Sequence, residues 1–131
     1  MDIKEVKITE VGPRDGFQSE KTILKTEDKI DVINNLIEAG FPRIEVSSFV
    51  SPKAIPQLAD AEKILNKVNR SSQTTLAALV PNARGALRAV EAKLDEIVVF
   101  LSASESHNKK NVNKMRLLSI YYYIIFYLFC F

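Results

Sequence analysis

The chain has 131 residues, of which 47% are hydrophobic and 26% charged, as in an ordinary globular domain. Its net charge of +2 is too small to indicate a nucleic acid or an anionic membrane as a partner. The single cysteine, Cys130, excludes an internal disulfide, and the N-terminus lacks the apolar segment of a signal peptide. We therefore expect a cytoplasmic protein.

Strand-like and helix-like segments alternate along residues 1–116, in units of about 30 residues, which is typical of parallel strands joined by crossover helices. The pattern predicts four strands, at 6–9, 43–47, 74–79 and 96–101. It predicts three helices between them, at 26–39, 59–68 and 82–92. The last strand is apolar enough to be buried on both faces.

Three residues mark the expected helix ends. Thr26 is a plausible N-cap because acidic residues follow it in the first turn, and Asn82 is a plausible N-cap of the third helix. Gly40 is expected to end the first helix, since glycine often follows the C-cap. After the fourth strand we expect a polar loop that contains His107, the only histidine.

Two architectures fit this order, a (β/α)8 TIM barrel and an open doubly wound sheet. Polar residues follow the C-terminal ends of the strands, where barrel enzymes place their active sites; they include Glu10, Arg14, Asp15, Gln18, Ser47, Ser48, Asn82, Ser102 and Ser104. A complete barrel needs about 250 residues. We expect about the first four β/α units of a barrel, as a fragment or completed by a second copy or another chain.

Residues 117–131 differ abruptly from the rest, with no charged residue, glycine or proline and with all four tyrosines. A membrane anchor is one interpretation, but a helix needs about 20 residues to cross a bilayer. A buried strand pair is a second interpretation. We favour a third, in which the segment is the product of a frameshift or truncation, and we place the domain boundary at residue 116.

The segment from Glu10 to Gln18 concentrates chemically useful residues directly after the first strand. Asp15 offers a hard oxygen ligand for Mg²⁺ or Mn²⁺, and Arg14 could stabilise negative charge that develops on a substrate oxygen. Glycines on both sides allow a sharp turn. The plain alternative is a polar turn with an Arg–Asp surface pair.

The motif Gly-Pro-Arg-Asp-Gly-x-Gln at residues 12–18 resembles the first-strand signature of the hydroxymethylglutaryl-CoA lyase family. Further stretches at 44–53, 80–82 and 102–113 resemble later segments of the same family, in the same order. The resemblance implies a TIM barrel that cleaves 3-hydroxy-3-methylglutaryl-CoA to acetyl-CoA and acetoacetate. It also implies an acyl-CoA substrate, a divalent cation (Mg²⁺ or Mn²⁺) and homo-oligomeric full-length members.

By position, the resemblance makes Asp15 a metal ligand, Arg14 the residue that contacts the substrate carbonyl and stabilises the enolate, and Glu45 and Glu10 active-site glutamates. Gln18 matches a substrate-binding position, although it could simply shape the loop. Glu45 could instead pair with Arg14 or Arg43, because buried acids are usually paired.

The family's remaining metal ligands, two histidines and an asparagine, lie on later strands, as does a reactive cysteine, and none has a counterpart here. We therefore expect this chain to be inactive alone. Two alternatives stay open. One is a non-catalytic interaction protein or membrane-associated fragment that uses the hydrophobic tail. The other is a condensing enzyme similar to homocitrate and isopropylmalate synthases.

Overall fold

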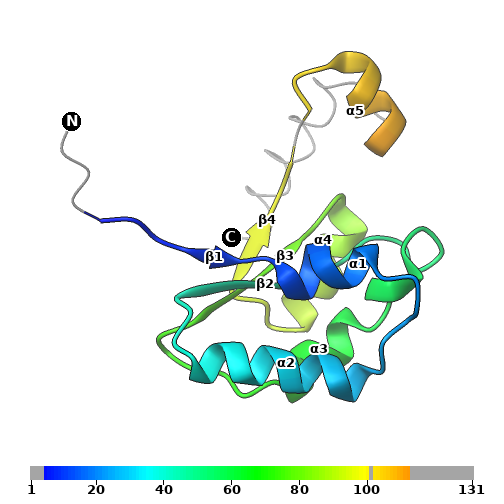
Figure 1. Ribbon diagram of the computed structural model, residues 1–131. Helices are drawn as coiled ribbons and strands as arrows, with labels where there is room; N and C mark the ends of the chain where they lie inside the picture. The colour runs from blue at the N-terminus through cyan, green and yellow to red at the C-terminus, as the bar shows by residue number, and fades with distance from the viewer. Residues whose placement is uncertain (1–4, 101, 113–131) are drawn as a thin grey trace.

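The computed structural model describes residues 5–100 and 102–112, which form an α/β layer around one parallel sheet (Figure 1). The strands are β1 (Thr9–Glu10), β2 (Arg43–Ser48), β3 (Thr75–Leu79) and β4 (Glu96–Val98), in the spatial order β1-β2-β3-β4. The helical elements are η1 (Gly12–Gly16, a π-helix), α1 (Phe17–Ser19), α2 (Thr26–Glu38), η2 (Pro56–Leu58, a 3₁₀-helix), α3 (Ala61–Lys67), α4 (Ala83–Glu91) and α5 (Glu105–Val112). Every adjacent strand pair is parallel, as the β/α alternation predicts.

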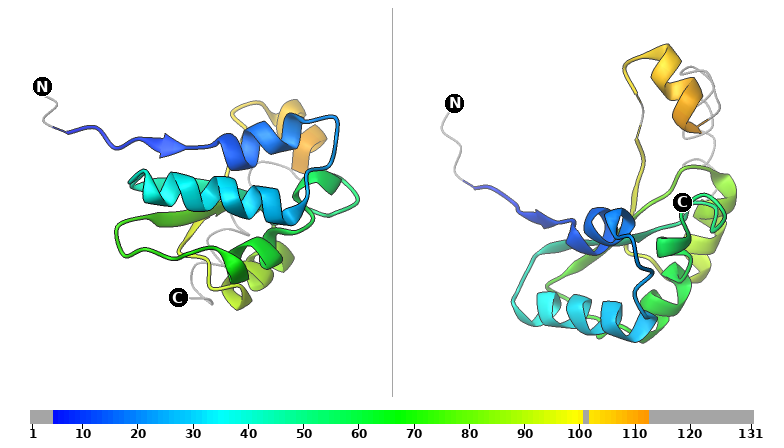
Figure 2. Two further views of the ribbon diagram at one scale, coloured as in Figure 1. Left: turned by 60° about the horizontal axis from the view of Figure 1, so that its bottom comes forward. Right: turned by 45° about the vertical axis from the view of Figure 1, so that its right-hand side comes forward.

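One face of the sheet is covered by helices and carries the hydrophobic core. Figure 2 shows α2 and α3 side by side beneath the strands, and residues of α4 belong to the same buried cluster. That cluster joins Ile44 and Val46 of β2 to Leu76 and Ala78 of β3, all at most 1% exposed. The opposite face, which we call the open face, carries Thr9, Arg43, Glu45 and Glu96.

The predicted helix ends are correct at two of three positions. Gly40 follows the C-cap of α2 with φ of +83°, a left-handed conformation that suits glycine. Asn82 is the N-cap of α4, and its side-chain oxygen accepts a hydrogen bond from the Gly85 amide at 2.9 Å. Thr26 is not the cap of α2, because it is already the first helical residue and its hydroxyl donates to Asp60 instead.

Both outer strands are shorter than predicted. The strand expected at 6–9 is formed only at Thr9–Glu10, and Val6 is 76% exposed. The strand expected at 96–101 ends at Val98, and its residues are exposed or half-buried, not buried on both faces. In the described part each outer strand pairs with a neighbouring strand on one side only. The backbone N–H and C=O groups on its other side have no strand to bond, so nothing on that side lengthens the strand.

Three further expectations concern the second predicted helix, His107 and the hydrophobic tail. The helix predicted at 59–68 is shorter, because α3 starts at Ala61 after the 3₁₀ turn η2. His107 lies in α5, not in a loop. The hydrophobic segment at 117–131 is outside the described residues. Among the helices that the structure describes, none combines the length and apolar character required to cross a membrane.

A buried ion pair ties α2 to the turn that precedes α3. Lys29 is 1% exposed, and its ammonium donates to both carboxylate oxygens of Asp60, at 2.9 and 3.0 Å, and to the Gln57 carbonyl at 2.6 Å. Thr26 donates to the same carboxylate at 2.8 Å. Because all three donors of the ammonium find acceptors, the buried charge is compensated.

The register between β2 and β3 shifts by one residue in the middle of β2. Glu45 lies opposite Ala77, whereas Ser47 lies opposite Ala78, so Val46 is an extra residue. Ser47 thereby lies opposite a core residue and is fully buried, and its hydroxyl oxygen is the buried side-chain atom without a hydrogen-bond partner in the described part.

Candidate active site

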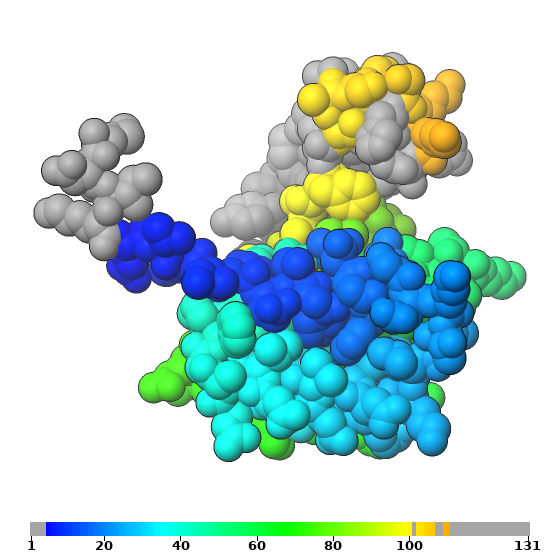
Figure 3. Space-filling model, in the orientation of Figure 1, coloured from blue at the N-terminus to red at the C-terminus, as the bar shows by residue number. Residues whose placement is uncertain are grey.

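The segment that follows β1 forms a compact helical turn that aims Arg14 at the sheet. The Arg14 and Asp15 amides donate to the Val11 carbonyl at 3.0 and 2.7 Å, and Pro13 is buried against the body. In Figure 3 the N-terminal segment before the turn projects away from the rest of the molecule, whereas the turn itself packs against the body. The turn therefore brings an arginine and an acid to the C-terminal edge of the sheet.

Gly12 lies against the side chain of Glu10 in this turn. The Glu10 carboxylate folds back and accepts a hydrogen bond from the Gly12 amide at 2.6 Å, and a Cβ on Gly12 would lie 2.9 Å from the same oxygen. Gly16 has no comparable constraint, since its φ is −63° and no atom lies within 4 Å of the Cβ position. Neither glycine has a positive φ, so the turn does not use the backbone freedom that was expected of them from the sequence.

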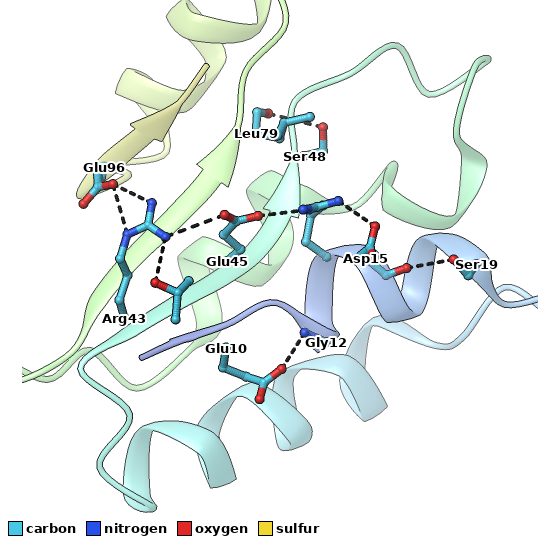
Figure 4. A network of polar contacts seen from close by, with 11 residues as sticks. Glu10, Gly12, Asp15, Ser19, Arg43, Glu45, Ser48, Leu79 and Glu96 are labelled. Atoms are coloured by element: carbon cyan, nitrogen blue, oxygen red, sulfur yellow. Dashed lines mark hydrogen bonds and ion pairs between the residues drawn. The ribbon is translucent and has the colours of Figure 1, made fainter. Parts of the chain in front are cut away.

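Arg14 links the turn to β2 (Figure 4). Its Nε donates to Glu45 Oε2 at 3.0 Å, and its Nη1 donates to Asp15 Oδ1 at 2.7 Å. The Glu45 side chain is 10% exposed, Arg14 20% and Asp15 62%. The guanidinium is therefore fixed between a buried and an exposed carboxylate.

A second arginine approaches Glu45 from the other side. Arg43 Nη1 lies 3.6 Å from Glu45 Oε1 and donates to the Thr9 hydroxyl at 3.2 Å, while its Nε donates to Glu96 Oε1 at 3.0 Å (Figure 4). The hydrogen bond to Glu96 raises the pKa of Arg43, and its charge is thus permanent. The resulting chain of alternating charges runs from β4 across β2 to η1, and the Thr9 hydroxyl of β1 bonds to it.

The structure thus brings together Arg14, Asp15 and Glu45, and it places Glu10 and Gln18 differently. Glu10 caps its own turn through the Gly12 amide. Gln18 lies in α1, half-buried, and its side chain forms no hydrogen bond with other described residues. The pairing of Glu45 with both arginines was one of the two interpretations of that residue.

The contact between Arg43 and Glu96 was not anticipated. Arg43 and Glu45 are two residues apart on a strand and so share a face, which is a signal in the sequence. Glu96, however, depends on the register of β4, and sequence alone does not give that register.

The donor set fits part of a divalent-cation site. Asp15 presents a largely exposed carboxylate with hard oxygen donors, at the edge where the strands end. Across residues 5–100 and 102–112, no three histidine, cysteine, aspartate or glutamate side chains gather in a way that could hold a metal ion. These residues would therefore supply one carboxylate ligand of such a site.

Comparison with known proteins identifies relatives over most of the chain. The model of the HMGL-like family matches residues 5–121. A hydroxymethylglutaryl-CoA lyase from Bacillus subtilis is 52% identical over 111 residues, which cover 85% of this chain and 37% of that protein. The mitochondrial hydroxymethylglutaryl-CoA lyase of Bos taurus is 47% identical over 84% of this chain and 34% of its own length.

Solved structures give the same result. The HMG-CoA lyase of Bacillus subtilis superposes with a TM-score of 0.87 at 50% identity, over 91% of this chain and 40% of that one. The enzyme from Acinetobacter baumannii, determined with coenzyme A and 3-methylmalate, superposes with a TM-score of 0.88 at 45% identity, over 92% and 39%.

This chain spans less than half the length of these relatives. The relatives are TIM barrels, and the parallel sheet corresponds to their N-terminal part, so the predicted fold class is confirmed. The chain belongs to the HMGL-like family.

Proposed function

We propose that the described residues form one wall of the active site of a carbon–carbon lyase that cleaves 3-hydroxy-3-methylglutaryl-CoA to acetyl-CoA and acetoacetate. The observation that supports this is the geometry of Arg14, which is held between Glu45 and Asp15 at the C-terminal edge of a parallel sheet. Ligands of such sheets bind at that edge. The names of the relatives supply the reaction class.

The reaction needs a positive charge where Arg14 is placed. The C3 hydroxyl loses its proton, the bond between C2 and C3 breaks, and the electron pair forms a thioester enolate, which gives acetyl-CoA once C2 is protonated. Arg14 has Nη2 left for a substrate oxygen after Nε bonds Glu45 and Nη1 bonds Asp15. A fixed cation stabilises the enolate at no cost of reorganisation.

In this proposal Glu45 is a positioning residue. It is buried between Arg14 and Arg43, so its carboxylate stays close to both cations and fixes the direction of Arg14. Glu10 acts on the turn itself through the Gly12 amide, and Gln18 extends the same surface for substrate contact.

Asp15 would contribute one ligand to Mg²⁺ or Mn²⁺. When bound, such a cation lowers the pKa of a coordinated hydroxyl and orients the substrate. Because a single carboxylate leaves most of the coordination shell to water, we propose that the 131-residue chain does not turn over substrate alone.

Two assays test these proposals. The first measures acetoacetate release by the purified chain with Mg²⁺ or Mn²⁺, where sustained turnover would contradict inactivity. The second places residues 5–100 in the Bacillus subtilis lyase in exchange for the matching segment. We expect an active chimera, and Arg14→Gln in it should lower kcat by about 10²–10³-fold.

Lys63→Gln is the control in the chimera, because Lys63 is exposed on α3 and has no ion pair in the described part. A folded chimera whose kcat is unchanged by Arg14→Gln would remove the assigned role. The relatives named above are lyases, which favours cleavage over condensation. The alternative that relies on residues 117–131 concerns a segment outside the described structure.

A further inference from the structure

Both outer strands of the sheet have one edge without a partner strand in the part of the chain that the structure describes. Such an edge presents backbone N–H and C=O groups that another strand can bond. β1 and β4 run in the same direction, because every pair between them is parallel. The edge of β4 in one molecule can therefore accept β1 of another molecule as its next parallel strand.

The number of strands favours a closed arrangement of two copies over an open one. The relatives with known structure are TIM barrels, which have eight parallel strands, and this sheet has four. Two copies related by a two-fold rotation would supply all eight, and each copy would use both of its edges. A head-to-tail contact of this kind forms a ring when the rotation closes. In such a barrel the helices lie outside and the open face of each sheet lies inside.

The register of the sheet predicts which residues would meet where the copies join. Thr9 lies opposite Arg43, and two residues further on a row of neighbours runs across the sheet from Val11 to Glu96. In an eight-stranded barrel of this class such a row is displaced by about eight residues in one circuit, and so by about four in each copy. Because the strands tilt with the right-handed twist of the sheet, the displacement is toward their N-terminal ends. The row should thus continue from Glu96 to Lys7 of the second copy.

Lys7 and Glu96 carry opposite charges that the single molecule leaves partly unused. Lys7 is exposed and forms no ion pair with any other described residue. The Glu96 side chain is 47% exposed, and Arg43 donates to its Oε1 alone, at 3.0 Å from Nε and 2.5 Å from Nη2. Oε2 is therefore available to the Lys7 ammonium of a second copy. An exposed pair adds little affinity, but it helps to fix the register between the two strands.

The apolar residues at the two edges would meet on the opposite face. Val6 and Ile8 alternate with Lys7, so on a continued β1 they point to the helix-covered side of the sheet, and they are 76% and 62% exposed. On β4, Ile97 packs against the core from that side, and Val99, two residues later, is 48% exposed. Figure 2 shows the segment before β1 extending away from the body. Pairing with β4 of a second copy would cover these side chains, and this burial would drive the association.

We propose that two copies of the 131-residue chain associate head to tail, with β1 of each paired to β4 of the other, and close one eight-stranded barrel. The hydrophobic segment at 117–131 fits these edges less well, because it carries no charge to offer Lys7 or Glu96. A TIM barrel made of one chain has both edges filled, so this contact differs from any interface between complete barrels. The association does not depend on the proposed reaction. It would bring Arg14 and Asp15 of both copies to the same rim, because the C-terminal ends of parallel strands share one edge.

Cysteine cross-linking of the full chain tests the pairing directly. In a Cys130→Ser background, a mixture of Lys7→Cys chains and Glu96→Cys chains should form a disulfide-linked dimer with oxidised glutathione, because paired residues on adjacent strands lie within reach of a disulfide. Each variant alone should remain monomeric on a non-reducing gel, since neither residue meets its own counterpart. Within one molecule the two positions are three strand spacings apart, on the order of 14 Å, which is too far for an internal bond.

Sedimentation of the 131-residue chain over a range of concentrations tests the association itself. We expect monomer and dimer without larger species, because the closed ring leaves no edge for a third copy. Lys7→Glu should raise the dimer dissociation constant about tenfold, since like charges then face each other at both junctions. Lys63→Glu is the matched control, because Lys63 is exposed on α3, between α2 and α4 in the chain, and has no ion pair in the described part. Ile8→Asp should weaken the dimer more than Lys7→Glu, because it also removes apolar burial.

A chain that stays monomeric at every concentration, or that forms open oligomers of increasing size, would overturn the closed pair. So would a dimer that Lys7→Glu leaves unchanged and that gives no cross-link in the mixture, because another surface, such as residues 117–131, would then hold the copies together. Circular dichroism checks that the variants at Lys7 and Ile8 stay folded, as expected for exposed positions. None of these measurements uses lyase activity, so a negative result leaves the proposed function standing.

Discussion

Arg14 and Glu45 are 31 residues apart in the chain, and the Nε of Arg14 donates to Glu45 Oε2 at 3.0 Å. This bond fastens the turn after β1 to the middle of β2. Arg43 reaches the other oxygen of the same carboxylate at 3.6 Å. Glu45 is therefore the anion that keeps two arginines together on the open face.

Glu45→Gln should destabilise the protein by about 2 kcal/mol, because two cations then face each other without the buried charge that separates them. The free energy of unfolding, obtained from urea titration, measures this effect. Glu27→Gln is the matched control, since Glu27 pairs with Lys67 at 3.8 Å with both side chains more than 60% exposed. Its effect should stay below about 0.5 kcal/mol. Similar losses in the two variants would show that the buried pair contributes no more than a surface pair.

Lys29→Met should lower the free energy of unfolding by about 3 kcal/mol, although it makes a buried position apolar. The reason is that the Asp60 carboxylate and the Gln57 carbonyl lose their shared donor. The double variant Lys29→Met, Asp60→Asn should recover part of the loss, because it removes the unpaired charge. If Lys29→Met were as stable as the original chain, the Asp60 carboxylate would have to be hydrated in the variant, and the buried pair would contribute nothing to stability.

Gly85→Ala and Gly16→Ala should have opposite effects on the melting temperature. Alanine at 85 gains helix propensity of about 1 kcal/mol, yet its Cβ would lie 2.7 Å from the backbone oxygen of Phe49, so α4 must move and stability should fall. Alanine at 16 meets nothing within 4 Å at a φ of −63°, so it should stabilise by about 0.5 kcal/mol. If Gly85→Ala also raised the melting temperature, the close contact between α4 and the Phe49 backbone, just after β2, would be contradicted.

Acid should weaken the link between α3 and α4. The hydrogen bond from Arg88 lowers the pKa of Glu62 below its ordinary value of 4.5. A carboxyl whose folded pKa is lowered contributes stability above the unfolded value and loses it as the pH falls through the folded value. The difference in urea midpoint between the original chain and Glu62→Gln should therefore be largest above pH 4.5 and shrink on acidification. A difference that does not change with pH would contradict this.

The central elements could be predicted from the sequence, because periodic apolar residues decide them locally. In α3, Ile64 and Leu65 are buried as their spacing indicates, and Gly40 ends α2 through its own backbone preference. The outer strands could not be predicted in the same way. Val99 is apolar and yet 48% exposed, because the extent of a strand depends on a neighbour that pairs with it.

The candidate site likewise has features that a local sequence pattern predicts and features that depend on the tertiary fold. The composition of residues 10–18 is a local signal, and it pointed to Arg14 and Asp15. The partners of Lys29 are not local, although Lys29 is one helical turn from buried Ile33 and so lies on the apolar face of α2. Whether such a lysine is solvated or paired depends on which loop packs against it. That information lies in the tertiary fold.

The extra residue in β2 changes how point deletions and insertions in that strand should be interpreted. Past Val46 the strand resumes with its phase inverted, so Ser48, opposite Leu79, follows Glu45 on the same face at a spacing of three. A pattern of that kind imitates helical periodicity inside a strand. A chain that lost Val46 would regain simple alternation, with Ser47 still opposite Ala78 and Ser48 still opposite Leu79, so the hydrogen bond from the Ser48 hydroxyl to the Leu79 carbonyl should survive the deletion.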